Sequence, residues 1–223
     1  MRFKEALKRP GVNIISEFKR ASPSLGDIDL TADPVERALQ YERGGAAAMS
    51  ILCDAARFKG SVEDLRRVAA ESKLPLLAKD FITTRERLAE VAEAGASAAL
   101  LIVRYLTDGQ LADLLGETRR LGMDALVETH TEAEIERALA AGADIVGVNC
   151  RDLETLSVDL SVSERLIRLI PGECVKVAES GVASHGDIVR LAAAGADAFL
   201  VGTTLMKSKN PVEKLIELKG EHK

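Results

Sequence analysis

Eight short apolar runs, rich in Val, Ile and Leu, alternate with amphipathic segments along this chain of 223 residues. Each run has the length and the β-branched composition of a strand covered on both faces, as strands are in a parallel sheet. The predicted strands span residues 12–19, 47–53, 74–81, 98–103, 125–129, 145–149, 175–180 and 198–203.

The segments between these runs carry apolar residues at helical spacing, and several open on a Ser or Thr that can cap a helix. Helices are predicted over residues 61–72, 84–94, 107–121, 131–141, 161–170 and 184–194, and two more begin at Asp33-Pro34 and Asn210-Pro211. Four helices end in a small-residue element that contains glycine, at residues 44–46, 94–96, 141–143 and 194–196. Glycine there provides the left-handed cap that turns the chain into the next strand.

A strict strand-then-helix order with eight units leaves two architectures, a closed barrel and an open doubly wound sheet. The number eight favours the barrel, and the first predicted strand lacks the Gly-x-Gly-x-x-Gly sequence of a dinucleotide-binding sheet. The chain length also falls in the range of such barrels. We therefore predict an α/β protein, a (βα)8 TIM barrel in which residues 1–223 form a single domain.

The composition narrows the classes of partner. With 30 basic and 35 acidic residues the chain has a formal charge of −5, so nucleic acid is not an expected partner. Three scattered cysteines, Cys53, Cys150 and Cys174, fit neither a disulfide framework nor a zinc site. No apolar run approaches the roughly 18 residues that cross a bilayer. We expect a cytoplasmic monomer that has no membrane partner.

Polar residues close five of the eight predicted strands, at the ends that meet on one rim of a barrel. They are Glu17, Lys19, Lys79, Asp80, Glu128, Asn149 and Glu179. Any one of them could belong to a structural ion pair inside the barrel. Burying so many charges on one rim without partners would cost on the order of several kcal/mol each, so we interpret the cluster as a catalytic site.

Two neighbouring strands end in glycine-containing segments, Glu179-Ser180-Gly181 and Val201-Gly202-Thr203. Loops at these two places commonly bind phosphate in a (βα)8 barrel, because glycine lets backbone N–H groups approach the oxygens. Glycine also serves ordinary turns, so the hypothesis depends on the two segments occurring together. A small phosphorylated molecule is the expected ligand.

Several blocks of the sequence resemble the indole-3-glycerol phosphate synthase family. Residues 17–24 read Glu-Phe-Lys-Arg-Ala-Ser-Pro-Ser, and residues 147–153 read Gly-Val-Asn-Cys-Arg-Asp-Leu. Further matching blocks lie at residues 50–52, 58–61, 79–81, 126–128, 179–181 and 201–203. The resemblance implies a carboxy-lyase of tryptophan biosynthesis that closes the ring of 1-(2-carboxyphenylamino)-1-deoxyribulose 5-phosphate and releases carbon dioxide and water. It implies neither a metal nor an organic cofactor.

The resemblance also assigns the proton-transfer roles. Lys79 matches the acid that protonates the ribulose carbonyl oxygen, and Glu128 matches the general base that takes a proton as the hydroxyl leaves. Lys19 would hold the substrate carboxylate or assist the dehydration. An ordinary lysine is a weak acid near neutral pH, so we expect burial or a neighbouring cation, such as Lys19, to lower the pKa of Lys79.

Three further rim residues would support these groups. Glu17 would pair with Lys19, Asn149 would hydrogen-bond the intermediate, and Glu179 would position substrate hydroxyls or the lysines. His130 follows the Glu128 strand end at a position that is often His in the family. We expect it to have a capping or structural role rather than a catalytic one.

The substrate-binding residues implied by the resemblance lie in the loops that follow the strands. They are Ser22, Pro23, Phe58, Phe81, Arg151, Leu153, Ser180, Gly181, Gly202 and Thr203. Phe58 and Phe81 would offer apolar faces to the aromatic ring, although ordinary packing also explains a buried Phe. Arg151 would hold the substrate carboxylate through its planar guanidinium.

The sequence departs from the family at its N-terminal end. Family members usually carry a helical segment before the barrel, and this sequence begins near its last turn, at residues 3–7, so we expect weaker substrate affinity with the catalytic groups intact.

Two rival functions compete with the one that this family implies. Phosphoribosylanthranilate isomerase is one rival, but it is expected to use a Cys base and an Asp acid, whereas the first strand here ends in Glu17 and Lys19. A non-catalytic barrel that binds sugar phosphates or supports a partner subunit is disfavoured by the retained lysines and Glu128.

Overall fold

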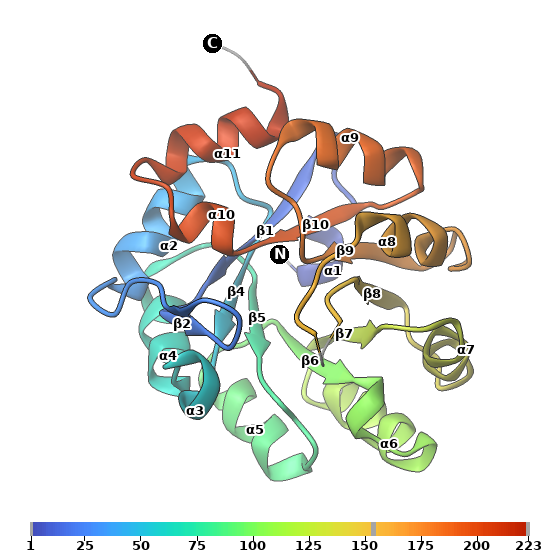
Figure 1. The fold of residues 1–223 in the computed structure, drawn as a ribbon. Helices are drawn as coiled ribbons and strands as arrows, with labels where there is room; N and C mark the ends of the chain where they lie inside the picture. The colour runs from blue at the N-terminus through green and yellow to red at the C-terminus, as the bar shows by residue number, and fades with distance from the viewer. Residues whose placement is uncertain (1, 153–154, 222–223) are drawn as a thin grey trace.

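Eight parallel strands close into a barrel in the computed structural model, which describes residues 2–152 and 155–221 (Figure 1). The barrel strands are β1 (Asn13–Phe18), β4 (Ala48–Leu52), β5 (Leu76–Lys79), β6 (Ala98–Ile102), β7 (Asp124–Thr129), β8 (Ile145–Asn149), β9 (Val175–Glu179) and β10 (Ala198–Val201). Each strand pairs with the barrel strand that follows it in the chain, and β1 pairs with β10 to close the ring. The prediction of a closed (βα)8 barrel is confirmed.

Helices surround the barrel and follow its strands in turn (Figure 1). The longer ones are α2 (Pro34–Arg43), α4 (Val62–Glu71), α5 (Arg85–Glu93), α6 (Asp108–Arg120), α7 (Glu132–Ala140), α8 (Leu160–Ile167), α9 (His185–Ala193) and α11 (Pro211–Lys219). Most begin at the predicted cap. The exception is α8, which begins before Ser161 because the carboxylate of Asp159 caps it by accepting from the Ser161 N–H at 2.9 Å.

The four glycine-containing turns also have the predicted geometry. Gly45, Gly95, Gly142 and Gly195 all have a positive φ, between 75° and 105°. Residues with a side chain adopt this left-handed region at a cost, so glycine at these positions ends each helix and directs the chain into the next strand.

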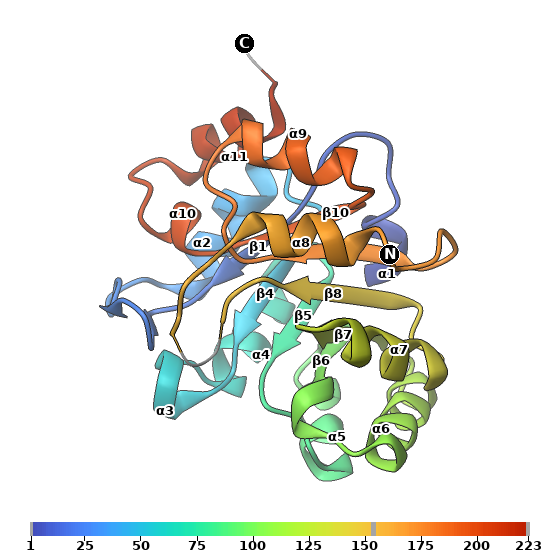
Figure 2. The same ribbon diagram turned by 45° about the vertical axis from the view of Figure 1, so that its right-hand side comes forward.

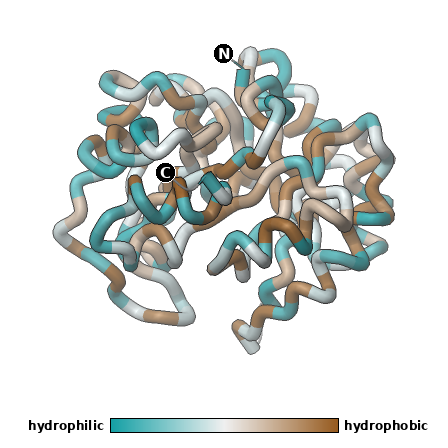
Figure 3. The backbone as a smooth tube through the Cα atoms, turned by 90° about the horizontal axis from the view of Figure 1, so that it is seen from above, coloured by the Kyte–Doolittle hydropathy of each residue, from teal (hydrophilic) through white to brown (hydrophobic). Residues whose placement is uncertain are grey.

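Alternate residues of each strand face two separate apolar layers. Along β1, Ile14 and Phe18 pack outward against the helices, and Ile15 packs into the barrel interior. Figure 3 shows brown apolar residues recurring among teal polar ones along the surrounding helices, as expected for helices that bury one face. Because of this alternation Glu17, two residues after Ile15, points into the barrel at the C-terminal ends of the strands.

The N-terminal helix α1 (Phe3–Ala6) closes the other end of the barrel. Phe3 and Leu7 are fully buried and pack with the interior layer. The side chain of Asn13 donates from Nδ2 to the carbonyl oxygens of Leu7 and Arg9 and holds the segment against β1. Figure 2 shows α1 at the opposite end of the barrel from the loops that carry the predicted site.

The loops at the C-terminal strand ends contain short elements that the sequence did not predict. They are the hairpin β2 (Ala21–Ser22) and β3 (Gly26–Asp27), the helices α3 (Ala55–Phe58) and α10 (Thr203–Met206), and the 3-10 helix η1 (Val103–Tyr105). The last predicted strand was too long by two residues, because the chain turns at Gly202 and Thr203 begins α10. Within the described residues, no helix combines the length and the apolar character that crossing a membrane requires.

Candidate active site

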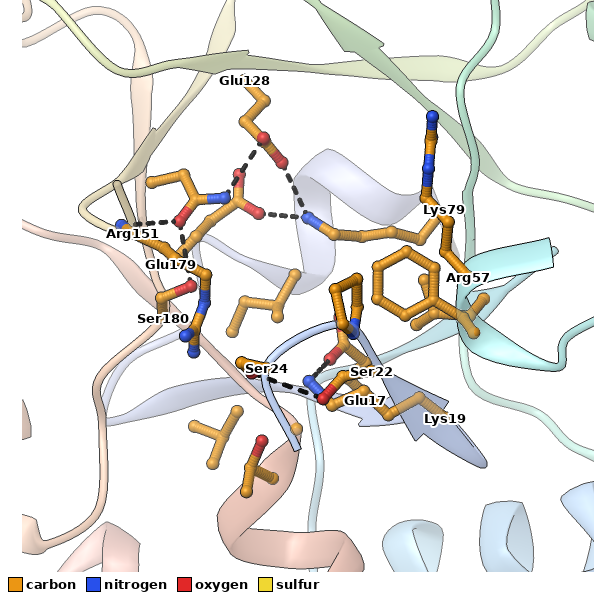
Figure 4. A pocket seen from close by; sticks show the side chains of 18 of the residues that line it. Glu17, Lys19, Ser22, Ser24, Arg57, Lys79, Glu128, Arg151, Glu179 and Ser180 are labelled. Atoms are coloured by element: carbon orange, nitrogen blue, oxygen red, sulfur yellow. Dashed lines mark hydrogen bonds and ion pairs between the residues drawn. The ribbon is translucent and has the colours of Figure 1, made fainter. Parts of the chain in front are cut away.

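A cavity of about 770 Å³ lies at the C-terminal ends of the strands. All predicted site residues that the structure describes line it, as Figure 4 shows for many of them. These residues are Glu17, Lys19, Ser22, Pro23, Phe58, Lys79, Phe81, Glu128, Asn149, Arg151, Glu179, Ser180, Gly181, Gly202 and Thr203. Leu153, the remaining predicted residue, lies outside the described part of the chain. The structure thus brings residues from distant parts of the sequence into one cavity.

Lys79 lies between two carboxylates on the floor of this cavity (Figure 4). Its Nζ atom is 2.9 Å from Oε2 of Glu128 and also donates to Oε2 of Glu179. The three side chains come from β5, β7 and β9, and both carboxylates are buried. One ammonium group is therefore paired with two carboxylates, so these three side chains carry a net negative charge when all are ionised.

In this arrangement the pKa of Lys79 shifts in the opposite direction to the one expected from the sequence. Burial disfavours the ammonium form, but the facing carboxylates of Glu128 and Glu179 outweigh it and raise the pKa of Lys79 above its ordinary value. The prediction of a lowered pKa is therefore wrong. Lys19, the cation proposed to lower it, is itself paired with Glu17, at 2.6 Å from Nζ to Oε1.

The two carboxylates beside Lys79 differ in their protonation. Burial, helped by the nearby charge of Glu128, raises the pKa of Glu179 to about 7 against the opposing effect of Lys79. The Oε1 atom of Glu179 has no hydrogen-bond partner among the described residues. Burial acts on Glu128 too, but Lys79, His130 and a hydrogen bond from Asn149 oppose it and hold the pKa of Glu128 below its ordinary value. The site therefore favours the ionised form of Glu128 and the protonated form of Glu179.

We expect Glu179→Gln to make the protein more stable than the parent at pH 8, by about 1 to 2 kcal/mol in the free energy of unfolding. The fold raises the pKa of Glu179, so this carboxyl favours the folded state at low pH, and that contribution is lost as the pH rises from about 4.5 through about 7. The amide removes the buried charge and can still accept a hydrogen bond from Lys79. Urea unfolding at pH 8 and pH 5 measures the difference, which should shrink at the lower pH.

The exposed Glu71→Gln is the matched control for this prediction, and its unfolding should follow the parent at both pH values. A Glu179→Gln variant that is less stable than the parent at pH 8 would show that the ionised carboxylate stabilises the fold.

The ion pair of Glu17 and Lys19 lies against the end of β10. An added Cβ atom at Gly202 would collide with the carboxylate of Glu17 and come close to Nζ of Lys19. Glycine at this position therefore makes room for the pair. Lys19 consequently lies beside one of the two predicted phosphate-binding segments.

Asn149 connects Glu128 with the other predicted phosphate-binding segment. Its Nδ2 atom donates to Oε1 of Glu128 at 3.2 Å. Its Oδ1 atom accepts from the hydroxyl of Ser180 at 2.9 Å and from the backbone N–H of Arg151 at 3.1 Å. These contacts fix the orientation of the amide. Ser180 has a φ of 66°, a left-handed conformation that costs energy for a residue with a side chain and often occurs at functional sites.

Gly147 on β8 makes room for the second carboxylate. An added Cβ atom there would collide with Oε1 of Glu179, the carboxylate oxygen that lacks a hydrogen-bond partner. The sequence block around residue 147 included this glycine but gave no reason for it. Its missing side chain allows Glu179 to lie beside Lys79.

Aromatic and cationic side chains form the mouth of the cavity. The guanidinium of Arg57 stacks over the ring of Phe81 at 4.1 Å, and Tyr105 meets the same ring edge-on at 5.5 Å between centroids. Arg151 is partly engaged, since its Nη1 atom donates to the carbonyl of Leu156 at 2.9 Å.

Sequence reasoning missed Arg57 and Tyr105, which both line the cavity. Arg57 directly precedes Phe58, so the matching block at residues 58–61 could have pointed to it. Tyr105 follows β6, which ends without a polar residue, and the sequence gave no signal for it. Within the described residues, no group of three or more His, Cys, Asp and Glu side chains is arranged to hold a metal ion.

The sequence is similar to known proteins over most of its length. A family model described as indole-3-glycerol phosphate synthase matches residues 1–218. The chain is 46% identical over 213 residues to the indole-3-glycerol phosphate synthase of Mycobacterium avium, covering 96% of this chain and 78% of that protein. It is 48% identical over 212 residues to the protein of the same name from Paenarthrobacter aurescens, covering 95% and 78%.

A solved structure shares the fold. The N-acetylmannosamine-6-phosphate 2-epimerase from Clostridium perfringens superimposes with a TM-score of 0.68 over 89% of this chain and 88% of that one. The two sequences are 17% identical, so this likeness concerns the fold alone.

Proposed function

Because the chain belongs to the indole-3-glycerol phosphate synthase family, it is a carboxy-lyase of tryptophan biosynthesis, and we propose that the cavity residues carry out the reaction. The substrate is 1-(2-carboxyphenylamino)-1-deoxyribulose 5-phosphate. Its aromatic ring lies at the mouth beside Phe58 and Phe81, and its phosphate lies at the segments around Gly181 and Gly202. The observation that carries the proposal is the position of Lys79 between two carboxylates. The same cavity contains the aromatic residues and the two glycine-containing segments.

Ring closure comes first. The aromatic carbon that bears the carboxylate attacks the ribulose carbonyl, and Lys79 gives a proton to the carbonyl oxygen as negative charge develops there. Lys79 is a weak acid in the free site, because two carboxylates stabilise its ammonium form. The oxygen that it protonates becomes alkoxide-like in the transition state, so the transfer is still favourable.

Loss of carbon dioxide and water follows. The carboxylate leaves as carbon dioxide, and the electron pair of the broken bond restores the aromatic ring. The new hydroxyl then takes a proton from Lys19, or from Lys79 once solvent water has reprotonated it, and leaves as water. Glu128 accepts a proton from the intermediate in this step, and a carboxylate held ionised by its neighbours suits that role.

Two arginines are available for the substrate carboxylate. Arg151 keeps N–H groups beyond the one that bonds Leu156, and Arg57 carries its charge over Phe81 at the cavity mouth. A planar guanidinium can hold a carboxylate with two parallel hydrogen bonds. The cytoplasmic location and the monomeric state remain predictions from the sequence.

The test is direct turnover of the substrate by the parent protein. We expect indole fluorescence to rise and one carbon dioxide to be released for each indole formed. Binding without turnover would instead support a non-catalytic sugar-phosphate barrel, and isomerisation of phosphoribosylanthranilate would support the rival enzyme. Either result, with no indole formed, would overturn the proposal.

A further inference from the structure

His130 lies between the proposed general base and a second carboxylate. Its ring follows the end of β7 and its side chain is 8% exposed. Nε2 lies 3.4 Å from Oε1 of Glu128, and Nδ1 lies 3.2 Å from Oε2 of Glu134, in the first turn of α7. The backbone N–H of His130 donates to the same Oε2 atom at 2.7 Å, so Glu134 is fixed on the Nδ1 side.

This geometry determines where the imidazole carries its proton. A carboxylate oxygen is an acceptor, so Nδ1 donates to Glu134. In a neutral ring, Nε2 then presents a lone pair to Oε1 of Glu128, and two acceptors that face each other repel. Nε2 is buried and has no hydrogen-bond partner within the described residues. A second proton on the ring turns this repulsion into the attraction of an ion pair at 3.4 Å.

The charges around His130 favour that second proton. Glu128 and Glu179 face it from β7 and β9, Glu134 faces it from α7, and Lys79 lies on the far side of Glu128. Arg104 of η1 is paired with Glu134 at 3.8 Å. Burial opposes the charged form, but Glu134 and Glu128 outweigh it and raise the pKa of His130 above its ordinary value.

We propose that His130, in its protonated form, is a positioning residue: it holds Oε1 of Glu128 and so keeps Oε2, which faces Lys79, oriented into the cavity where the intermediate must lose its proton. The proposal rests on the proposed role of Glu128 as the general base. Loss of the Nε2 proton at high pH releases this hold and weakens the base, so His130 sets the alkaline limit of the activity.

The first test measures the interaction between His130 and Glu128 without using enzymatic activity. Histidine-labelled full-length protein is titrated by NMR, where the chain contributes only three histidines. We expect Glu128→Gln to move the titration of His130 to lower pH, since the facing carboxylate is lost, and the surface change Glu71→Gln to leave it unmoved. A His130 titration that is the same in the parent and in Glu128→Gln would overturn the proposal.

The second test uses the pH profile of turnover. His130→Gln cannot gain a proton, so we expect kcat to fall about tenfold at the parent's optimum, as for the loss of one buried charged contact, with KM nearly unchanged. The alkaline fall of kcat seen in the parent should disappear from its former position. Glu134→Gln keeps an acceptor for Nδ1 and should shift the alkaline limb to lower pH.

A structural role alone would change the height of these profiles and not their shape. Profiles of both variants that superimpose on the parent after scaling would therefore overturn the proposal. If the parent forms no indole, the proposed function fails, and the NMR titration still decides whether Glu128 and His130 share a proton.

Discussion

Replacing Lys79 with methionine is expected to lower kcat for indole formation by about a thousandfold. Methionine keeps an unbranched apolar side chain but supplies no proton to the ribulose carbonyl. Ring closure is the first bond-forming step, so neither carbon dioxide nor indole should appear at the parent's rate. Single-turnover experiments that follow both products measure the loss.

The variant Lys79→Arg separates the two tasks of the ammonium. Its guanidinium retains the positive charge between Glu128 and Glu179 but holds its protons too strongly to act as an acid. We expect the arginine variant to unfold closer to the parent than the methionine variant does, and to remain nearly inactive. Lys73→Met, an exposed change before β5, is the control for the loss of a lysine elsewhere. Substantial turnover by either Lys79 variant would remove Lys79 from the proton transfer.

Methionine at position 79 also leaves two buried carboxylates without their shared cation. Breaking a buried ion pair typically costs about 3 to 5 kcal/mol, unless the remaining charges become neutral. Glu128 and Glu179 can do so by taking up protons, so the loss of stability should be larger at pH 8 than at pH 5. The rate measurements therefore belong at a pH where the variant is shown to be folded.

The barrel could be predicted from the sequence because the features that indicate it are local. Strand length, apolar runs and the glycine-containing turns at Gly45 and Gly95 depend on neighbouring residues, and they determined the order of the elements. The position of the site followed from the same pattern, since parallel strands end on one rim. Glu17 and Lys79 could be placed there before the partners of either residue were known.

The protonation of the site depends on contacts between strands, and the sequence predicted the direction of the pKa shift of Lys79 wrongly. The pKa of Lys79 is set by carboxylates on β7 and β9, and the sequence does not show which side chains meet across the barrel. The same limit hid the difference between Glu128 and Glu179, which depends on His130 and Asn149 on one side and on an unpartnered oxygen on the other. Loop residues such as Arg57 were missed because short loops have no periodic pattern.

Glu128 and Glu179 differ in the direction of their pKa shifts, and this difference suits consecutive steps of one reaction. An ionised Glu128 is ready to accept a proton, whereas the raised pKa of Glu179 lets this carboxyl take up a proton more readily as the charge of Lys79 changes. Gly147 permits this arrangement by leaving space for the second carboxylate. A site with two equally paired glutamates would hold Lys79 still more firmly in its ammonium form.

Glu128→Gln is expected to lower the rate of indole formation by about a hundredfold to ten-thousandfold, with KM within a few-fold of the parent. The amide is nearly isosteric with the carboxylate but cannot accept the proton that the intermediate must lose. Lys79 keeps Glu179 as a partner and remains available for ring closure. The block should therefore fall after carbon dioxide has left, and a single turnover should release carbon dioxide ahead of indole.

This order of release distinguishes the roles of the two residues more sharply than the size of either loss. Lys79→Met should delay both products together, because it acts on the first step, and Glu128→Gln should separate them. Glu71→Gln, with its exposed carboxylate, should release both products as the parent does. If Glu128→Gln delays carbon dioxide as much as indole, Glu128 acts in ring closure or in holding Lys79, and the base for the last proton must be another group of the cavity.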